Sequence, residues 1–302
     1  AFAPDCVGPA ASAAARGLAP GEVLLLENLR FHEAEEANDR AFARQLAGLA
    51  DAYVNDAFGT AHRAHASTAA VAELLPAAAG LLMERELEAL GGALDQPRRP
   101  FVGIVGGAKI SSKIAVLENL LPKVDRLIVG GAMAFTFLRA QGARTGRSLV
   151  EENQLDVAGR ILERAGEKLM LPLDAVAAAE LKPGAVTRTV DARAVPDDLI
   201  GLDVGVRSVQ AWQAALRGAG TVLWNGPVGA YETPPFEQGT IALGRAVAES
   251  GATSVVGGGD LVAALEQGGL AARMSHVSTG GGASLEFMEG KTLPGVAALP
   301  DA

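Results

Sequence analysis

Two lysines in the segment GGAKISSKIAVLENLL have a spacing that suits a polyphosphate. Lys109 and Lys113 stand four residues apart at the start of a predicted helix, which places both ammonium groups on one face beside the positive end of the helix. Two like charges are unfavourable there unless an anion is bound. The alternative is a pair of solvated surface lysines, and the segment by itself leaves both interpretations open.

A second candidate is the stretch TSVVGGGDLVAAL, residues 253–265, in which a β-branched run passes through glycines into an apolar helical pattern. A strand that turns through glycines into a helix directs free backbone N–H groups at the turn, and these groups favour an anion. The carboxylate of Asp260 at the mouth of the same helix is therefore unexpected from the local pattern.

Arginines and histidines follow two predicted strands in the first part of the chain. Arg30 and His32 come directly after one strand, and His62, Arg63 and His65 come after another. A guanidinium forms bidentate bonds to carboxylate or phosphate, so arginines at neighbouring strand ends could hold a small acidic substrate. The alternative is a set of ordinary surface charges.

The elements that position these residues alternate between apolar β-rich runs and helical patterns, which predicts parallel sheets with helices on their faces. The run EVLLLENLRF is expected to be a buried strand, and AYVNDAF a second strand. Between them, NDRAFARQLAGLA predicts a helix with Phe42, Leu46 and Leu49 on one face. A charged amphipathic helix over residues 81–94 leads into DQPRRP, so a domain boundary is expected near residues 80–100.

Five later runs each resemble a strand that ends in glycines: FVGIVGG, RLIVGG, TVLWNGPVG, TSVVGGG and SHVSTGGG. The carboxyl ends of parallel strands lie on one edge of a sheet, so the five turns are expected to line a single crevice. The alternative is that each glycine only permits a tight corner.

Composition and motif spacing exclude several classes of protein. The chain has 302 residues, 49% of them hydrophobic, and a net charge of -9, which disfavours a nucleic-acid or anionic-membrane partner. The single cysteine, Cys6, cannot form an intrachain disulfide and suits a reducing cytoplasm, where we expect it to be inert. Val262 and Leu285 occupy positions where a dinucleotide fingerprint requires glycine, and Leu285 also breaks the P-loop pattern before Gly290. A nicotinamide enzyme and a P-loop ATPase are therefore disfavoured.

Nine motifs in one order resemble those of the phosphoglycerate kinase family, and the likeness runs from about Gly21 to Ala297. They are ENLRFH, DAFGTAHRAHAS, GGAKISSKI, GGAMAFTFL, LPLDAVAA, GLDVG, WNGPVGAYE, VVGGGD and HVSTGGGASLEFMEGKTLPGV. The resemblance implies an α/β fold of two Rossmann-like three-layer domains whose parallel sheets face each other across a cleft, with the first domain incomplete.

The same resemblance implies a domain organisation in four parts. Residues 1–80 would be the remainder of an N-terminal phosphoglycerate-binding domain, and residues 81–100 an interdomain helix and linker. Residues 101–289 would form the C-terminal nucleotide-binding domain, and residues 290–302 a tail returning to the first domain.

The reaction that the resemblance implies is reversible phosphoryl transfer between 1,3-bisphosphoglycerate and Mg-ADP, giving 3-phosphoglycerate and Mg-ATP in glycolysis. It implies a cytoplasmic monomer with small-molecule substrates and no nucleic-acid or membrane partner. Carried over by position, the catalytic residues would be Lys109, Gly281 and Gly282, and the substrate-binding residues Arg30 and Arg63. The nucleotide-binding residues would be Lys113, Gly131, Gly201, Asn225, Glu232, Gly258, Gly259, Asp260 and Leu261.

Two of these positions carry more specific expectations. Glu232 is expected to contact the ribose. Asp260 is expected to bind Mg²⁺, which prefers oxygen ligands and commonly combines one or two carboxylates with phosphate oxygens. That role would explain the acid in the glycine turn, and Lys109 and Lys113 would supply the positive charge that the turn lacks.

The sequence departs from the family in two respects. The family's opening segment, with its Asp-x-Asn strand, precedes the region that this chain matches, so we expect poor stability in the first domain. The alternative to the enzyme is a truncated, non-catalytic nucleotide-binding remnant. Leu261 stands where the family usually has serine or threonine. We expect weakened nucleotide binding there, with the backbone N–H still available.

Overall fold

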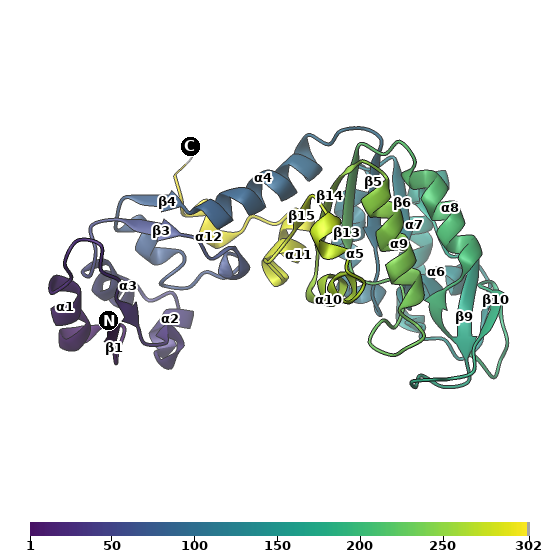
Figure 1. Cartoon of the computed structure of the whole chain (residues 1–302), viewed down its shortest axis with the longest axis horizontal. Coiled ribbons are helices and arrows are strands. Elements are labelled where there is room, and N and C mark those ends of the chain that lie inside the picture. Colours follow the sequence, from purple (N-terminus) through teal and green to yellow (C-terminus); the bar gives the residue numbers. More distant parts are fainter. Residues whose placement is uncertain (301–302) are drawn as a thin grey trace. The chain divides into compact units, whose positions relative to one another are not determined.

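The computed structural model describes residues 1–300 and divides the chain into two compact units (Figure 1). Unit 1 comprises Ala1–Glu88 together with the segment that begins at Lys291, and unit 2 comprises Ala89–Gly290. Among residues 1–300, no helix has the length and apolar character needed to cross a membrane.

Unit 2 is built on a six-stranded parallel sheet with the strand order β15-β14-β13-β5-β6-β8. Its strands are short, apolar and rich in β-branched residues, as buried parallel strands generally are. Their bounds are Phe101–Val105 (β5), Arg126–Val129 (β6), Leu169–Met170 (β8), Thr221–Asn225 (β13), Thr253–Gly257 (β14) and His276–Val277 (β15). The order proceeds outward from β5 in one direction through β6 and from β13 in the other, so the topological switch point lies between β5 and β13.

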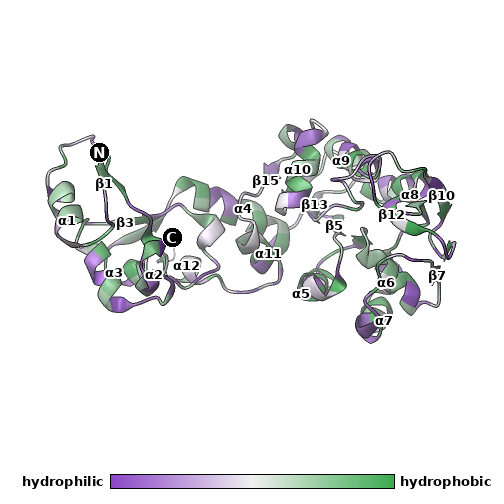
Figure 2. Ribbon diagram, turned by 90° about the horizontal axis from the view of Figure 1, so that it is seen from below, coloured by the Kyte–Doolittle hydropathy of each residue, from purple (hydrophilic) through white to green (hydrophobic). Residues whose placement is uncertain are grey.

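Helices cover both faces of this sheet, which makes unit 2 a three-layer α/β unit (Figure 2). One face carries α8 (Val206–Leu216), α9 (Gln238–Glu249) and α10 (Gly259–Gln267). The other carries α5 (Ile114–Leu120), α6 (Met133–Ala140) and α7 (Leu155–Ala165). The predicted α/β class with a parallel sheet is therefore confirmed.

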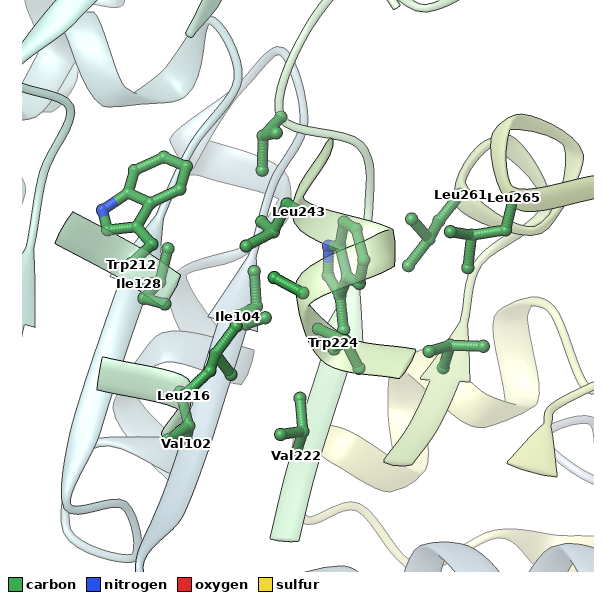
Figure 3. Close-up of a cluster of buried hydrophobic side chains, with 14 of the residues drawn as sticks. Val102, Ile104, Ile128, Trp212, Leu216, Val222, Trp224, Leu243, Leu261 and Leu265 are labelled. Carbon is green, nitrogen blue, oxygen red and sulfur yellow. The ribbon is translucent and has the colours of Figure 1, made fainter. Parts of the chain in front are cut away.

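A large core of unit 2 lies between the sheet and helices α8, α9 and α10 (Figure 3). Trp224 projects from β13 into this layer, and Trp212 reaches it from α8. Both indoles are fully buried. Burial of these large aromatic side chains contributes strongly to the stability of unit 2.

Two further sheets in unit 2 were not predicted from the sequence. Strands β10 and β12 pair antiparallel with a central strand β9, and β7 pairs with β11. The bounds are Asp174–Ala178 (β9), Arg188–Asp191 (β10), Ile200–Val204 (β12), Arg144–Thr145 (β7) and Ala194–Val195 (β11). The register of β9 with β12 shifts between Gly201 and Asp203. Pairing of this kind joins segments that lie apart along the chain, so local patterning does not reveal it.

Unit 1 contains two parallel two-stranded sheets, β1 with β2 and β3 with β4. The strands span Phe2–Ala3 (β1), Leu25–Leu26 (β2), Tyr53–Asn55 (β3) and Ala77–Ala79 (β4). The helices span Gly8–Arg16 (α1), Glu33–Glu36 (α2), Arg40–Ala47 (α3), Leu81–Asp95 (α4) and Pro294–Ala297 (α12). Helix α4 passes from unit 1 into unit 2 after Glu88.

The predicted helices of unit 1 are present, although α3 ends at Ala47 and so excludes Leu49, and one predicted strand is wrong. Helix α3 buries Phe42 and packs Leu46 against the same cluster. The run EVLLLENLRF, expected to be a buried strand, forms only the two-residue β2, and Val23 and Leu25 are 77% and 66% exposed. Because β2 pairs with a single two-residue partner, the rest of this apolar run has no ladder to join.

Candidate functional site

A pocket of about 320 Å³ lies at the carboxyl ends of three neighbouring strands of unit 2, and we call it the lysine pocket. Its strands end in register, because Val105 of β5 pairs with Asn225 of β13, and Asn225 pairs with Gly257 of β14. The lining comprises Gly106, Gly107, Ala108, Lys109, Ser112, Lys113, Asn225, Gly226, Pro227, Gly258, Gly259 and Asp260. The pocket thus occupies the switch point, where open parallel sheets bind ligands.

The glycines around the lysine pocket allow backbone segments to approach closely. A Cβ atom on Gly106 would lie 2.1 Å from the carbonyl oxygen of Pro227, and one on Gly226 would lie 2.4 Å from the carbonyl oxygen of Gly106. Gly226 also has a φ of +82°, which other residues rarely adopt. These glycines are needed for the corner and at the same time leave space for a ligand above it.

The two lysines bracket a short 3₁₀ turn instead of sharing one face of an α-helix, so the predicted helical arrangement is wrong. Lys109 immediately precedes η4 (Ile110–Ser112), and Lys113 follows it as the residue before α5. Both nevertheless line the same pocket. Glu151 holds the turn between them, since its carboxylate accepts hydrogen bonds from the N–H and hydroxyl groups of Ser111 at 3.1 and 2.6 Å.

Lys113 is the more enclosed of the two lysines and has a specific partner. Its Nζ donates to Oδ1 of Asn225 at 2.5 Å, and Nδ2 of Asn225 donates to the carbonyl of Gly257 at 3.1 Å. Burial lowers the pKa of Lys113, and the nearby carboxylates of Glu289 and Asp260 partly offset this effect. A partly desolvated ammonium of this kind gains most from an added anion.

Helix α10 begins at the lysine pocket. Gly258 precedes it with a φ of +98°, and the first hydrogen bond of the helix runs from the N–H of Val262 to the carbonyl of Gly258 at 3.0 Å. The amides of Gly259, Asp260 and Leu261 therefore belong to the first turn, which has no carbonyl one turn earlier to accept from it. The predicted glycine turn that leads from a strand into the start of a helix is therefore present.

Leu261 differs from the other predicted nucleotide-binding residues because its side chain is fully buried. It packs into the core on the side of Trp224 and Leu265 (Figure 3). Only its backbone N–H is therefore directed toward the start of α10. The side chain at this position contributes to the core of unit 2 and has no direct access to a ligand.

Asp260 suits the magnesium ion that the sequence motifs imply. Its exposed carboxylate lies at the second position of α10 and lines the lysine pocket. A single carboxylate beside a phosphate-binding turn matches the preference of Mg²⁺ for oxygen ligands shared between protein, phosphate and water. A second group of potential ligands, Asp5, Cys6 and His32 in unit 1, does not fit this ion, because it includes a fully buried thiol.

An adjoining pocket of about 480 Å³, which we call the apolar pocket, shares Gly107, Ala108, Pro227 and Asp260 with the lysine pocket. Its apolar lining includes Phe135, Leu149, Pro172, Leu181, Ile200 and Val228. Three predicted residues also line it: Gly131, Gly201 and Glu232. The ring of Phe135 packs directly on Gly201, where a Cβ atom would come within 2.1 Å of it.

The remaining glycine turn lies outside both pockets. Gly281, with a φ of +52°, and Gly282 stand at the start of α11 (Gly282–Met288), after β15 at the edge of the sheet. The predicted single crevice is thus only partly correct. Turns after β5, β13 and β14 line the lysine pocket, and the turn after β6 lines the apolar pocket, but the lining of neither includes the turn after β15.

Arg30 and Arg63 both lie in unit 1, but the strands before them belong to different sheets. Strand β2 pairs with β1 and strand β3 pairs with β4, so the expectation of neighbouring strand ends is wrong. The guanidinium of Arg30 lies 3.9 Å from Glu36, and that of Arg63 lies 3.4 Å from His62. Both arginines are solvent-exposed.

Sequence reasoning did not single out Asp203, although it lines the apolar pocket and is only 4% exposed. The signal that could have revealed it is a lone acid within the otherwise apolar run LIGLDVG. An unpaired buried carboxylate is costly, so its presence in such a run indicates a specific set of partners.

Ammonium groups, free amides and an oxygen ligand at the switch point are the groups that phosphoryl transfer requires. The fold and this chemistry define the protein as a kinase of the α/β class. The sequence model of phosphoglycerate kinase matches residues 1–291. The chain belongs to the phosphoglycerate kinase family and is a glycolytic kinase.

Individual relatives agree with this assignment. The phosphoglycerate kinase of Moorella thermoacetica is 59% identical over 300 residues, which cover 98% of this chain and 76% of the relative. The structure of phosphoglycerate kinase from Coxiella burnetii matches with a TM-score of 0.89 and 48% identity, covering 94% of this chain and 75% of that one. The enzyme from Pyrococcus horikoshii matches with a TM-score of 0.86 and 31% identity, covering 99% and 77%. The chain spans about three quarters of the length of these relatives.

Proposed function

We propose that the protein catalyses reversible phosphoryl transfer between 1,3-bisphosphoglycerate and Mg-ADP, giving 3-phosphoglycerate and Mg-ATP. The observation that carries this proposal is the convergence of Lys109, Lys113 and Asp260 on one pocket at the switch point of the sheet. The single cysteine suits a reducing cytoplasm. The family resemblance implies a monomer.

The phosphates of the nucleotide would occupy the lysine pocket. Lys113 would neutralise their charge from within the pocket, and the first amides of α10 would donate to phosphate oxygens. Asp260 would hold Mg²⁺ beside them, and the ion would supply neutralisation of charge between neighbouring phosphate groups. Asn225, which also lines this pocket, would hold Lys113 beside the phosphates through the hydrogen bond that its Oδ1 accepts from Nζ.

The base and ribose would occupy the apolar pocket. Its aliphatic and aromatic lining provides low-polarity surface for a flat base, and the absence of a side chain at Gly201 lets the ring of Phe135 form part of that surface. Gly131 lines the same pocket. The exposed carboxylate of Glu232 would accept hydrogen bonds from the ribose hydroxyls.

The phosphoglycerate would bind to unit 1 through Arg30 and Arg63. Each guanidinium is exposed, and the ion pair of Arg30 with Glu36 is long at 3.9 Å, so an incoming carboxylate or phosphate would compete well with it.

The reaction itself requires positioning and charge stabilisation more than covalent participation of the protein. The bond between the acyl oxygen and phosphorus breaks as a terminal phosphate oxygen of ADP forms a bond to the same phosphorus. The leaving carboxylate departs as 3-phosphoglycerate, so no proton is needed. Lys109 and the backbone N–H groups at Gly281 and Gly282 would stabilise the transferred phosphoryl group.

A coupled assay with 3-phosphoglycerate and Mg-ATP, run beside calorimetric titration with Mg-ADP, tests this proposal. We expect turnover that Lys109→Ala reduces by a factor on the order of 100 or more, with Mg-ADP affinity changed much less. Lys123→Ala serves as the control, because Lys123 contacts Asp95 at 3.5 Å outside both pockets.

Two results would contradict parts of this proposal. Turnover that survives the loss of Lys109 would remove its catalytic role. Tight Mg-ADP binding without any turnover would instead support a non-catalytic nucleotide-binding protein.

A further inference from the structure

Asp203 is a buried carboxylate that the proposed reaction does not use. It lies on β12, is 4% exposed and lines the apolar pocket. Removing a carboxylate from water is costly unless hydrogen bonds compensate, so its partners indicate what it does.

Those partners are backbone N–H groups of α9 and of β12. Oδ2 of Asp203 accepts a hydrogen bond from the N–H of Gly239 at 2.7 Å, in the first turn of α9. Oδ1 accepts from the N–H of Val204 at 2.8 Å, within β12 itself. The carboxylate therefore joins the start of α9 to β12.

The segment before α9, residues 226–237, carries Glu232, and we call it the glutamate loop. Its backbone lies directly against Asp203, because a Cβ atom on Gly229 would come within 2.1 Å of Oδ1. Just after the loop, in the first turn of α9, a Cβ atom on Gly239 would come within 2.3 Å of the same oxygen. Glycine at both positions allows the chain to wrap the carboxylate without a side chain between them.

Neighbouring contacts join the same loop to β12. The N–H of Ala230 donates to the carbonyl of Leu202 at 2.9 Å, two residues before Glu232. The N–H of Val228 donates to the hydroxyl of Thr240 at 3.1 Å, in the first turn of α9. The position of Glu232 therefore depends on how the loop and α9 are held against β12.

We propose that Asp203 is the positioning residue that fixes the glutamate loop, and with it Glu232, against the ribose end of the apolar pocket. This inference rests on the proposed nucleotide site and deepens it. Although Asp203 lines the pocket, each of its carboxylate oxygens accepts a hydrogen bond from a backbone N–H group. It therefore acts on the ligand through the loop, and its effect concerns the ribose hydroxyls more than the base.

The charge state of Asp203 makes this role sensitive to pH. Burial raises its pKa to about 7, the N–H groups of Gly239 and Val204 act against that shift, and the negative charge of Glu237 adds to it. Oε2 of Glu237 is itself buried without a hydrogen-bond partner among the described residues. An ionised carboxylate is the stronger acceptor, so the loop is held best above neutral pH.

The test uses adenosine as the probe, because it carries the base and ribose without the phosphates, whose own titration would obscure the result. We expect wild-type affinity for adenosine to fall as the pH is lowered through about 7. Asp203→Asn should weaken adenosine binding by roughly tenfold and abolish this pH dependence. Affinity for 2′,3′-dideoxyadenosine, which lacks the hydroxyls that Glu232 would bind, should be the same in both proteins.

Two further variants keep the inference falsifiable if Asp203→Asn folds poorly. Gly229→Ala should displace the loop and weaken adenosine binding in the same ribose-dependent way. Glu237→Gln should retain binding but move the midpoint of the pH profile to lower pH. Asp174→Asn is the matched control. Its carboxylate is 2% exposed and accepts from Ser208, so it should lose stability while keeping the wild-type pH profile.

The inference is overturned if Asp203→Asn binds adenosine as the wild type does, with the same pH profile. It is also overturned if adenosine and the dideoxy analogue weaken equally, because that result indicates general damage to the pocket. Failure of the wild-type protein to bind adenosine at any pH would instead contradict the proposed nucleotide site.

Discussion

The ammonium nitrogen of Lys113 lies 2.5 Å from the side-chain oxygen of Asn225, although the two residues are 112 positions apart. The same amide donates to the carbonyl of Gly257, so one buried side chain connects the turns that follow β5, β13 and β14. Asn225 thereby converts three separate glycine turns into one site with a fixed lysine.

Replacing Asn225 with alanine should weaken Mg-ADP binding by roughly tenfold, because Lys113 loses its hydrogen bond to Oδ1 of Asn225 and takes up several orientations. Calorimetric titration measures the change. Asn119→Ala is the control, since Asn119 donates to the carbonyl of Met288 at 2.8 Å and lines neither pocket. Equal affinity in Asn225→Ala and the wild type would show that the lysine needs no such support.

Asp260→Asn should reduce the advantage of Mg-ADP over metal-free ADP by on the order of tenfold, because the amide keeps the shape of the side chain but removes the charged oxygen ligand. Titrations with ADP in the presence of Mg²⁺ and of a chelator measure this difference directly. Glu266→Gln, on the exposed side of the same helix, should leave it unchanged. An unaltered preference for Mg-ADP in Asp260→Asn would rule out Asp260 as the metal ligand.

Leu261→Ser should destabilise unit 2 by about 2–4 kcal/mol, because it removes a fully buried side chain from the core and introduces a hydroxyl there. Restoring the hydroxyl that the family usually carries is therefore not expected to act on nucleotide binding alone. Urea unfolding followed by tryptophan fluorescence measures the change. Leu261→Met, which keeps the volume, should cost much less, and similar losses in both variants would argue against a packing role.

Unit 1 should unfold at a lower urea concentration than unit 2, because its strands form two-residue and three-residue pairs and its surface exposes Phe31 and Val23 by 74% and 77%. The chain supplies a separate probe for each unit. Cys6 is the single thiol, fully buried in unit 1 with a pKa that burial raises, and both tryptophans, Trp212 and Trp224, lie in unit 2.

Thiol labelling of Cys6 should therefore proceed before the tryptophan fluorescence changes. Coincident transitions for the two probes would show that the units unfold together and that unit 1 is not the weaker part. Rapid labelling in the absence of urea would contradict the buried position of the thiol.

The stability of unit 2 should carry a pH dependence from Asp203. Its pKa is raised from 3.8 to about 7, so the folded state binds this proton more tightly than the unfolded state does. Its contribution is fully present below about pH 4 and is lost as the pH rises through about 7, a change on the order of 4 kcal/mol.

The free energy of unfolding of Asp203→Asn, relative to the wild type, should accordingly rise as the pH increases over this range. Urea unfolding of both proteins at several pH values measures the difference. A difference that stays constant with pH would contradict the assignment. The ionised form that holds the glutamate loop best is thus the form that costs the fold most, a compromise common at functional sites.

The sequence by itself determined the α/β class, the glycine turns and the chemical groups of the site. These follow from short-range patterns, since a β-branched run followed by glycines specifies a strand and its turn without reference to the rest of the chain. The rule that parallel strands end at one edge was then sufficient to group Lys109 with Asp260 in advance. Patterning was weakest in unit 1, where EVLLLENLRF has the composition of a buried strand but lacks the pairing partners that would make it one.

Only the tertiary structure decided how these groups are used. It turned Asn225 toward Lys113, placed Leu261 in the core, left the turn at Gly281 outside both pockets, and surrounded Asp203 with the glutamate loop. Each outcome depends on segments that are distant in the chain and on the exclusion of water between them. The periodicity of the sequence indicates neither the contacts between distant segments nor the exclusion of water. Burial, hydrogen-bond partners and pKa depend on the residues packed around a group and not on its residue type alone.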